Sequence, residues 1–444
     1  MLTIQQVPCA FEGRVVMGPK ACCPPSESNE AASLAEPLPS GNPDEWNPSL
    51  QNRAVLSCPG LHTVVGKWTK TSPRFARARP KSGVETKRVD LSKIESESGA
   101  KALMPGVAKS GPFSKLMAGG RIFWHWAVRR SEVLPYPPVE ISIEPTNRCN
   151  FACQFCPQSS PSHFDQIPAS AIQPDGVEVL LGKIRNSGVK SDLLHWTLDG
   201  EPFMNKRFHE NLAVARDFGF SKHHFATNGM LLTLDRLSRL PSEGMSYVMT
   251  PDFCSDEAYF EQVRGTPGSW KTVRDNLIAA IEDPSLAHIQ FKITDISSYR
   301  FNDPQDLDRR FDELQSIFPK SDRVSFHRRV FHNASGKLDS RLSSKEGYRV
   351  CPYPWYTFFI AHNGDVVACC RDLEHQSVLG NLFEQELMEI WNGEKYQAMR
   401  RDLAGKRPEC QSACDGCDMP YDAAKFSLRN FVKTALHRML ILSR

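Results

Sequence analysis

From residue 138 onward, short apolar segments with strand periodicity alternate with longer amphipathic segments of helical periodicity. The strands are expected at 139–146, 193–198, 223–229, 246–253, 288–297 and 323–332, and the helices at 175–188, 206–220, 233–244, 269–283 and 303–318. A repeated strand–helix–strand order builds a parallel sheet that is covered by helices. Because six strands are fewer than the eight of a closed barrel, we predict an α/β fold with an open, partial (β/α)6 barrel.

The pattern also divides the chain. Residues 1–112 are rich in Pro, Ser, Gly and Lys and show no sustained period, so they are predicted to be a disordered N-terminal extension. Residues 113–340 are expected to form the barrel core, residues 345–425 a small C-terminal module, and residues 426–444 a tail helix. Within the small module, two short strands are expected to meet at an Asn-Gly hairpin turn, followed by one helix over 387–403.

The tail has apolar residues at helical spacing and basic residues largely between them. The apolar positions are Leu428, Val432, Leu436, Met439 and Leu440. We expect this amphipathic helix to pack on the barrel, and peripheral contact with an anionic membrane surface is the alternative.

Composition narrows the class of protein. Hydrophobic residues make up 40% and charged residues 24% of the 444 residues, as in a globular protein with a buried core. The net charge of +3 gives no reason to expect a nucleic-acid partner. The first residues lack a basic region followed by an apolar run, and no run reaches roughly eighteen apolar residues, so we expect a cytoplasmic location.

The 14 cysteines change this picture, because most of them fall in two groups with metal-ligand spacing. The first group, Cys149, Cys153 and Cys156, follows the first strand with the spacing C-x3-C-x2-C. Three thiolates on one loop suit three corners of a cubane iron–sulfur cluster and leave one iron open to a small molecule. The alternative is a zinc site completed by His163 or by a distant cysteine.

The segment EPTNRCNFACQFC, residues 144–156, resembles the signature loop of the radical S-adenosylmethionine superfamily. The resemblance implies that Cys149, Cys153 and Cys156 bind a [4Fe–4S] cluster whose open iron chelates S-adenosylmethionine. It further implies that an electron from the cluster cleaves this cofactor to a 5′-deoxyadenosyl radical. A reductase such as flavodoxin or ferredoxin is then the expected electron donor.

Four other segments resemble cofactor-binding elements of that superfamily. The turn Asp199-Gly200-Glu201-Pro202 resembles its Gly-Gly-Glu-Pro motif, with Asp199 in place of a glycine. By resemblance, Asn228 after the third strand, Thr250 and Asp252 at the end of the fourth strand, and Arg264 are further cofactor contacts. An ordinary turn at Asn228 and a surface position for Arg264 are the competing interpretations.

The second cysteine group lies in the small module. Cys351 and Cys369 flank the predicted hairpin, and Cys414 and Cys417 form a close pair, so these four are the expected ligands. Cys370 and Cys410 are left over, and either could replace one of the four. Four thiolates suit a closed iron–sulfur cluster and a structural zinc ion equally.

This segment resembles the SPASM/twitch extension of radical enzymes, including VVACCRD, LGNL and EIW. The resemblance favours iron and, because no cysteine follows Cys417, one auxiliary cluster in addition to the first. A cluster closed by four protein ligands is suited to passing electrons, which favours a net oxidation. Inward electron flow and substrate binding are the alternatives.

The expected activity is therefore hydrogen abstraction from an unactivated C–H bond of a small molecule or a peptide. A sugar-like or cyclitol-like alcohol is favoured, because one auxiliary cluster fits a two-electron dehydrogenation. A peptide- or protein-modifying radical maturase is the alternative within the superfamily. A non-catalytic iron–sulfur or zinc-binding protein is the alternative outside it. No residue of this chain is assigned as catalytic from sequence.

Overall fold

The computed structural model describes residues 112–160, 163–338 and 347–422. The predicted disordered extension, apart from Pro112, and the predicted tail helix over 426–444 lie outside these residues. No helix of the described part is long and apolar enough to cross a membrane.

One sheet of nine strands, in the order β6-β5-β4-β3-β2-β1-β7-β8-β9, organises the described residues. Its first six strands are β1 (Glu140–Ile143), β2 (Leu193–His195), β3 (Lys222–Thr227), β4 (Ser246–Phe253), β5 (Ile289–Asp295) and β6 (Val324–Arg328). These six pair in parallel and in sequence order. The sheet remains open in the described residues, with β6 and β9 as its edges.

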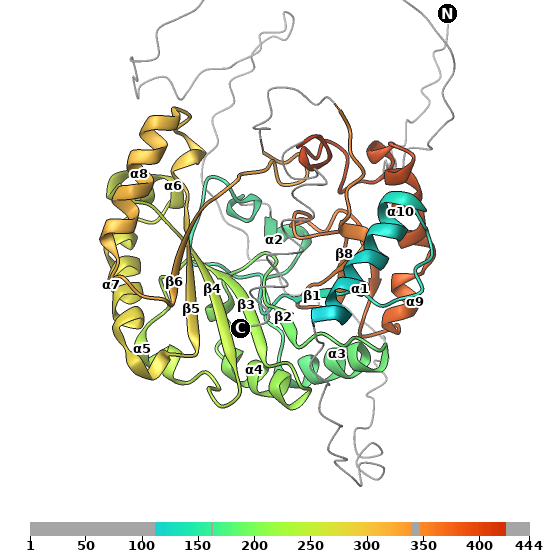
Figure 1. Ribbon diagram of the computed structural model, residues 1–444, viewed down its shortest axis with the longest axis horizontal. Coiled ribbons are helices and arrows are strands. Elements are labelled where there is room, and N and C mark those ends of the chain that lie inside the picture. The colour runs from blue at the N-terminus through green and yellow to red at the C-terminus, as the bar shows by residue number, and fades with distance from the viewer. Residues whose placement is uncertain (1–111, 161–162, 339–346, 423–444) are drawn as a thin grey trace, which may run out of the picture. The chain divides into compact units, whose positions relative to one another are not determined.

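Helices connect these strands and lie along one face of the sheet, which we call the outer face (Figure 1). The connecting helices are α3 (Pro174–Asn186), α4 (Phe208–Asp217), α5 (Leu234–Ser238), α6 (Glu257–Arg264), α7 (Ser269–Glu282) and α8 (Pro304–Ile317). Local sequence sets their ends. For example, Asp303 caps α8 by accepting a hydrogen bond from Asp306 N, and α6 ends at Gly265 with a φ of 63°. The predicted α/β fold with an open (β/α)6 arrangement is confirmed.

The two faces of the sheet differ in polarity. On β4, Tyr247, Met249 and Phe253 are fully buried against the helices, whereas Thr250 and Asp252 between them point to the opposite, inner face and are half-buried. The same alternation runs through β3 and β5. Since side chains alternate along a strand, the apolar rows pack on the helices and the polar rows share the inner face.

The strands of the predicted C-terminal module continue the same sheet. Strand β7 (Thr357–Ile360) pairs in parallel with β1, and β8 (Asp365–Val367) and β9 (Val378–Asn381) follow in antiparallel order. The Asn363–Gly364 hairpin forms as expected, with Gly364 at a φ of 85°. The module is thus joined to the core by backbone hydrogen bonds along β1 and β7.

One predicted helix is divided into two. The single helix expected over 387–403 is two helices, α9 (Leu387–Trp391) and α10 (Glu394–Ala404). The break falls at Gly393, whose extended backbone (ψ 165°) starts α10, and at Asn392, whose side chain bonds the backbone of Leu134 at 2.9 Å. Tertiary contact with the N-terminal segment therefore overrides the helical pattern. The N-terminal segment before β1 carries α1 (Pro112–Phe123) and a π-helix (Trp124–Val128). The short α2 (His163–Gln166) comes later, after β1.

Candidate active site

The first cysteine group lies on the loop that follows β1. Cys153 is buried, and Cys149 and Cys156 are half-buried. Burial raises the pKa of Cys149 to about 12, and burial likewise raises the pKa values of Cys153 and Cys156. The charge of Cys153 contributes to the raised pKa of both Cys149 and Cys156, so the three side chains face a common region. Such thiols ionise only when a cation shares the site.

Helix α6 holds this loop from one side. Ala152 N donates to Arg264 O at 3.2 Å, and Gln154 N donates to Val263 O at 2.9 Å. A Cβ atom at Gly265 would lie 2.3 Å from Ala152 O, and its φ is 63°. The loop therefore packs directly on a left-handed glycine at the end of α6.

The turn 199–202 holds the loop from the other side. A Cβ at Gly200 would lie 2.3 Å from Thr146 O and 2.5 Å from Arg148 O. Glu201 N donates to Arg148 O at 2.8 Å. No side chain larger than hydrogen fits at Gly200, because the backbone that leads into Cys149 passes there.

The Glu201 carboxylate is buried and joins this turn to the end of β3. It accepts hydrogen bonds from Thr227 Oγ1 at 2.9 Å and from Asn228 N at 2.7 Å. The Asn228 side chain in turn donates to Asn150 Oδ1 at 2.7 Å and lies 3.7 Å from Cys149 Sγ. The Asn228 turn thus reaches the cysteine loop.

Asp199 is buried and directed towards His163. Its Oδ2 atom lies 2.5 Å from His163 Nε2, and both side chains are fully excluded from solvent. Burial raises the pKa of Asp199 to about 6, while the hydrogen bond from His163 opposes that rise. The remaining polar atoms, Asp199 Oδ1 and His163 Nδ1, have no partner among the described residues. The hydrogen bond with Asp199 therefore anchors His163 to the turn 199–202.

Arg264, for which a surface position was the competing interpretation, is only 3% exposed. Its guanidinium donates to Asp252 at 2.9 Å and lies over the ring of Phe151 at 4.9 Å. Asp252 is also paired with Arg329. Thr250, two residues earlier on β4, points to the inner face and contacts His224 at 3.4 Å.

The second group brings together cysteines that are far apart in sequence. Burial raises the pKa of Cys351 to about 12 and raises the pKa values of Cys369, Cys370, Cys414 and Cys417. The charge of Cys417 contributes to the raised pKa of each of the other four thiols, Cys370 among them. Cys410 ends a short 3-10 helix, Pro408–Cys410.

A buried arginine accompanies the second group. Arg371 is 5% exposed, and its Nη1 atom lies 3.6 Å from Asp418 Oδ1. Its Nε atom has no hydrogen-bond partner among the described residues. A buried guanidinium beside several thiols suits a group that carries negative sulfur ligands.

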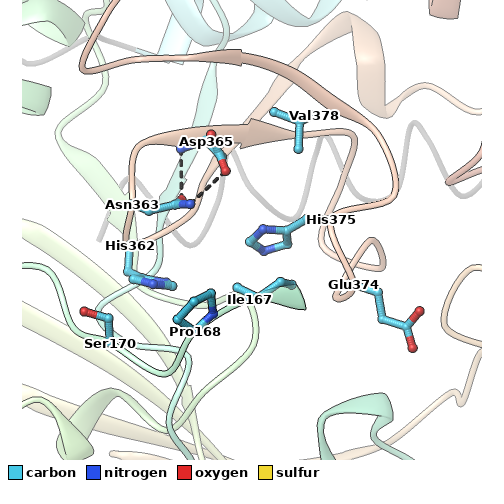
Figure 2. A pocket seen from close by; sticks show the side chains of 9 residues that line it. All are labelled: Ile167, Pro168, Ser170, His362, Asn363, Asp365, Glu374, His375 and Val378. Carbon is cyan, nitrogen blue, oxygen red and sulfur yellow. Dashed lines mark hydrogen bonds between the residues drawn. The ribbon is translucent and has the colours of Figure 1, made fainter. Parts of the chain in front are cut away.

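A pocket of about 510 Å³ lies where the hairpin of β7 and β8 meets the segment after the first cysteine loop (Figure 2). Ile167, Pro168 and His362 line one side, and His375 projects into it in Figure 2. Behind the pocket, the fully buried Glu144 accepts hydrogen bonds from His362 Nδ1 at 2.6 Å and from Asp199 N at 3.1 Å. Sequence reasoning missed Glu144 and His362, although Glu144 directly precedes Pro145 in the signature segment.

The donor sets fit iron–sulfur clusters better than single ions. Among the described residues, no three His, Cys, Asp or Glu side chains are close enough to hold one metal ion. A cubane cluster is larger than a single ion and is bound by thiolates at its separate corners. The first site has three thiols, with Gly200 and Gly265 beneath their loop, and the second site has five thiols. Both sets therefore match cubane iron–sulfur clusters.

Two sequence families match the chain. The radical SAM superfamily matches residues 143–283, and the SPASM iron–sulfur cluster-binding domain matches residues 351–418. The chain belongs to the radical S-adenosylmethionine superfamily and is a radical SAM enzyme with a C-terminal SPASM-type domain. Its cofactors are [4Fe–4S] clusters and S-adenosylmethionine.

Individual relatives are distant. The chain is 20% identical over 280 residues to the S-adenosyl-L-methionine-dependent 2-deoxy-scyllo-inosamine dehydrogenase of Niallia circulans, covering 63% of this chain and 92% of that protein. Among solved structures, BtrN in complex with AdoMet and 2-DOIA is 18% identical, covering 63% of this chain and 92% of that chain, with a TM-score of 0.42. Streptococcus suis SuiB bound to the precursor peptide SuiA is 14% identical, covering 74% and 81%, also with a TM-score of 0.42.

Proposed function

We propose that this radical SAM enzyme oxidises a secondary alcohol of a small sugar-like or cyclitol-like substrate to a ketone. The observation that carries the proposal is the polar inner face of the sheet. Barrel interiors are usually filled by Val, Ile and Leu. Here the inner positions carry groups that hydrogen-bond hydroxyls, namely Glu140, Ser142, His195, His224, Thr250, Lys292 and Thr294.

The residues proposed to hold the cofactors flank this face. Cys149, Cys153 and Cys156 would bind the first cluster, and Cys351, Cys369, Cys414 and Cys417 the auxiliary one. When bound, these groups supply a hydrogen-atom acceptor derived from S-adenosylmethionine and an acceptor for one electron.

The remaining proposed contacts would position S-adenosylmethionine. Gly200 lets the turn approach the cysteine loop, and Asn228 lies beside Cys149. Thr250, Asp252 and Arg264 would contact its polar groups from β4 and α6. Asp199 and Glu201 hold that edge of the site together through their buried hydrogen bonds, and the buried Pro202 follows them in the same turn.

The named activity of the Niallia circulans relative supports this substrate class, since an aminocyclitol is a ring of hydroxyl-bearing carbons. An electron donor such as flavodoxin or ferredoxin is part of the proposal. A peptide substrate, as in a radical maturase, is the competing outcome of the test.

The test uses the reconstituted, reduced enzyme with S-adenosylmethionine and 2-deoxy-scyllo-inosamine deuterated on its ring carbons. A parallel reaction contains a peptide whose Ser and Cys side chains are deuterated. We expect deuterium in 5′-deoxyadenosine and a product two hydrogens lighter than the aminocyclitol. Transfer from the peptide alone would overturn the substrate class, and iron-loaded protein that yields no 5′-deoxyadenosine would indicate a non-catalytic role.

A further inference from the structure

A buried arginine accompanies each cysteine group, and each of the two arginines faces an aspartate. At the first group, Arg264 donates to Asp252 at 2.9 Å, and Asp252 also pairs with Arg329. At the second group, the side chains of Arg371 and Asp418 are both 6% exposed, but Arg371 Nη1 lies 3.6 Å from Asp418 Oδ1. That separation exceeds the length of a hydrogen bond. Arg371 is therefore held less tightly by its aspartate than Arg264 is.

Two donor atoms of Arg371 are left without partners. Neither Nε nor Nη1 makes a hydrogen bond within the described part of the chain, and both atoms are closed to solvent. Buried N–H groups that donate to nothing cost free energy, because they have lost water and gained no partner. A negatively charged group with acceptor atoms beside Arg371 would satisfy these donors.

The neighbours of this guanidinium are the thiols of the second group. Arg371 directly follows Cys369 and Cys370 in sequence. Burial lowers the pKa of Arg371, but the charges of nearby groups, led by Cys370 and including Cys417 and Cys369, raise that pKa above its ordinary value. Burial raises the pKa of Cys351, and the charge of Arg371 opposes that rise. The guanidinium is thus close to thiols from three separate segments.

A turn after β6 holds Arg371 and Asp418 in place. Asn333 N donates to Asp418 Oδ2 at 3.1 Å, and Asp418 N donates to Asn333 Oδ1 at 3.2 Å. Ser335 Oγ donates to Arg371 O at 3.1 Å. Ala334 and Ser335 have φ values of 44° and 57°, a left-handed conformation that is unfavourable for residues with a Cβ. The contacts with Asp418 and Arg371 stabilise this turn, and the turn in return fixes the two charged residues.

We propose that Arg371 sets the reduction potential of the auxiliary cluster, and that Asp418 and Asn333 are positioning residues that hold its guanidinium beside the auxiliary thiols. The inference rests on the proposed function, which assigns an electron-accepting cluster to the second cysteine group. A buried positive charge favours the more negative, reduced form of a thiolate-bound cluster, and hydrogen bonds to its sulfur atoms act in the same direction. Asp418 carries the opposite charge and moderates this effect.

The electron that Arg371 would favour comes from the alcohol. Oxidation to a ketone breaks a C–H bond and an O–H bond and forms the second C–O bond. The carbon-bound hydrogen leaves as an atom to the radical derived from S-adenosylmethionine, and the hydroxyl proton leaves to solvent. The one remaining electron reduces the auxiliary cluster. Arg371 therefore makes this last transfer more favourable.

The first experiment measures the potential itself. In the full-length enzyme loaded with both clusters, the auxiliary cluster is titrated anaerobically and followed by electron paramagnetic resonance. The full-length variant with Cys149, Cys153 and Cys156 replaced by alanine identifies the auxiliary signal. We expect Arg371→Gln to lower the equilibrium constant for one-electron reduction about tenfold, which corresponds to a fall of about 59 mV.

Three further variants give the effect a sign and a control. Arg371→Lys keeps the charge but loses the planar fork, so its potential should lie between those of the wild type and of Arg371→Gln. Asp418→Asn removes the opposing charge and should raise the potential. Arg401→Gln on α10 is the matched control and should keep the wild-type potential, because its side chain is 54% exposed and solvent screens its charge.

Iron analysis of each variant keeps this test decisive. If Arg371→Gln loses the second cluster, a lower potential in Arg371→Lys together with a higher one in Asp418→Asn still supports the inference. Equal potentials in the wild type, Arg371→Lys and Asp418→Asn overturn it. A fall in Arg401→Gln as large as that in Arg371→Gln also overturns it, since the effect would then not depend on burial.

A second readout separates this inference from the proposed function. With the ring-deuterated aminocyclitol, Arg371→Gln should transfer deuterium to 5′-deoxyadenosine within about threefold of wild type and form about tenfold less ketone. Zinc at the second group of the wild type, or absence of deuterium transfer, contradicts the proposed function and removes the basis of the inference. A wild type that forms ketone, with a potential that does not depend on Arg371, contradicts the inference alone.

Discussion

The two cysteine groups are built in opposite ways. The first lies within residues 149–156 on one loop, which is held by backbone hydrogen bonds from α6 and by close contact with Gly200 and Gly265. The second is assembled from residue 351, from residues 369–370 and from residues 414–417, which the β7–β8 hairpin and later turns bring together. A loop with three thiols leaves part of a cluster open for chemistry, whereas a surplus of thiols from several segments can enclose one completely.

This contrast predicts that the first group is the more sensitive to change. Replacing Cys149, Cys153 and Cys156 together with alanine should abolish 5′-deoxyadenosine formation and reduce bound iron from about eight to about four atoms. Iron analysis and a deoxyadenosine assay measure the two effects. Unchanged iron content in this variant would contradict the ligand assignment.

A change in the backbone beneath the first cysteine loop should reduce 5′-deoxyadenosine formation almost as strongly as loss of the cysteines. Gly200→Ala places a Cβ 2.3 Å from Thr146 O, so the loop must move. We expect a loss of about 100-fold in deoxyadenosine formation, since a shift of about 1 Å at a reacting centre has effects of that size. Gly182→Ala on α3, whose Cβ would find its nearest neighbour at 4.0 Å, is the control and should keep full activity. Equal activity of the two variants would show that the loop tolerates displacement.

Substitutions in the second cysteine group test whether its surplus thiols are interchangeable as cluster ligands. Cys351→Ala should remove about four iron atoms, whereas Cys370→Ala should retain all of about eight. Metal analysis of both purified variants decides between them. Loss of iron in the Cys370 variant would place that residue among the ligands, and zinc in the wild-type protein would give the module a structural role.

The buried pair between the two regions should affect stability more than cluster content. Glu144 follows β1 and His362 follows β7, and their contact of 2.6 Å is closed to solvent. Glu144→Gln should lower the free energy of unfolding by about 2 kcal/mol, because it disturbs the buried hydrogen bonds that this carboxylate accepts from His362 and from Asp199 N. Chemical denaturation measures this change, and Glu386→Gln, at a half-exposed pair, should change it by less than about 1 kcal/mol.

The smallest expected effect is a pH dependence at His163. Burial lowers the pKa of His163, but the hydrogen bond and charge of Asp199 outweigh burial, so that this pKa lies above its ordinary value of 6.5. A raised histidine pKa stabilises the fold fully below pH 6.5, and that contribution is lost as the pH rises through the folded-state value. Stability of the wild type should fall over this range, and His163→Gln should flatten the profile. A wild-type stability that rises with pH there would contradict the pairing.

Periodicity and short motifs were sufficient for much of the molecule. The alternation of strands and helices predicted the open parallel sheet, and the spacing of Cys149, Cys153 and Cys156 pointed to the first site. These features could be read because they depend on neighbours in sequence. The break at Gly393 could not, because it depends on the contact between Asn392 and Leu134, residues that a sequence pattern does not connect.

The candidate site shows the same division. The sequence by itself determined which chemical groups are present and which of them follow strand ends, since local spacing fixes both. Tertiary structure alone decided that Asp199 reaches His163, that Glu144 joins His362, and that Cys370 lies among the auxiliary thiols. It also brought Glu140, His195 and His224 into one row, because register across neighbouring strands is set by packing of the whole sheet and not by any single strand.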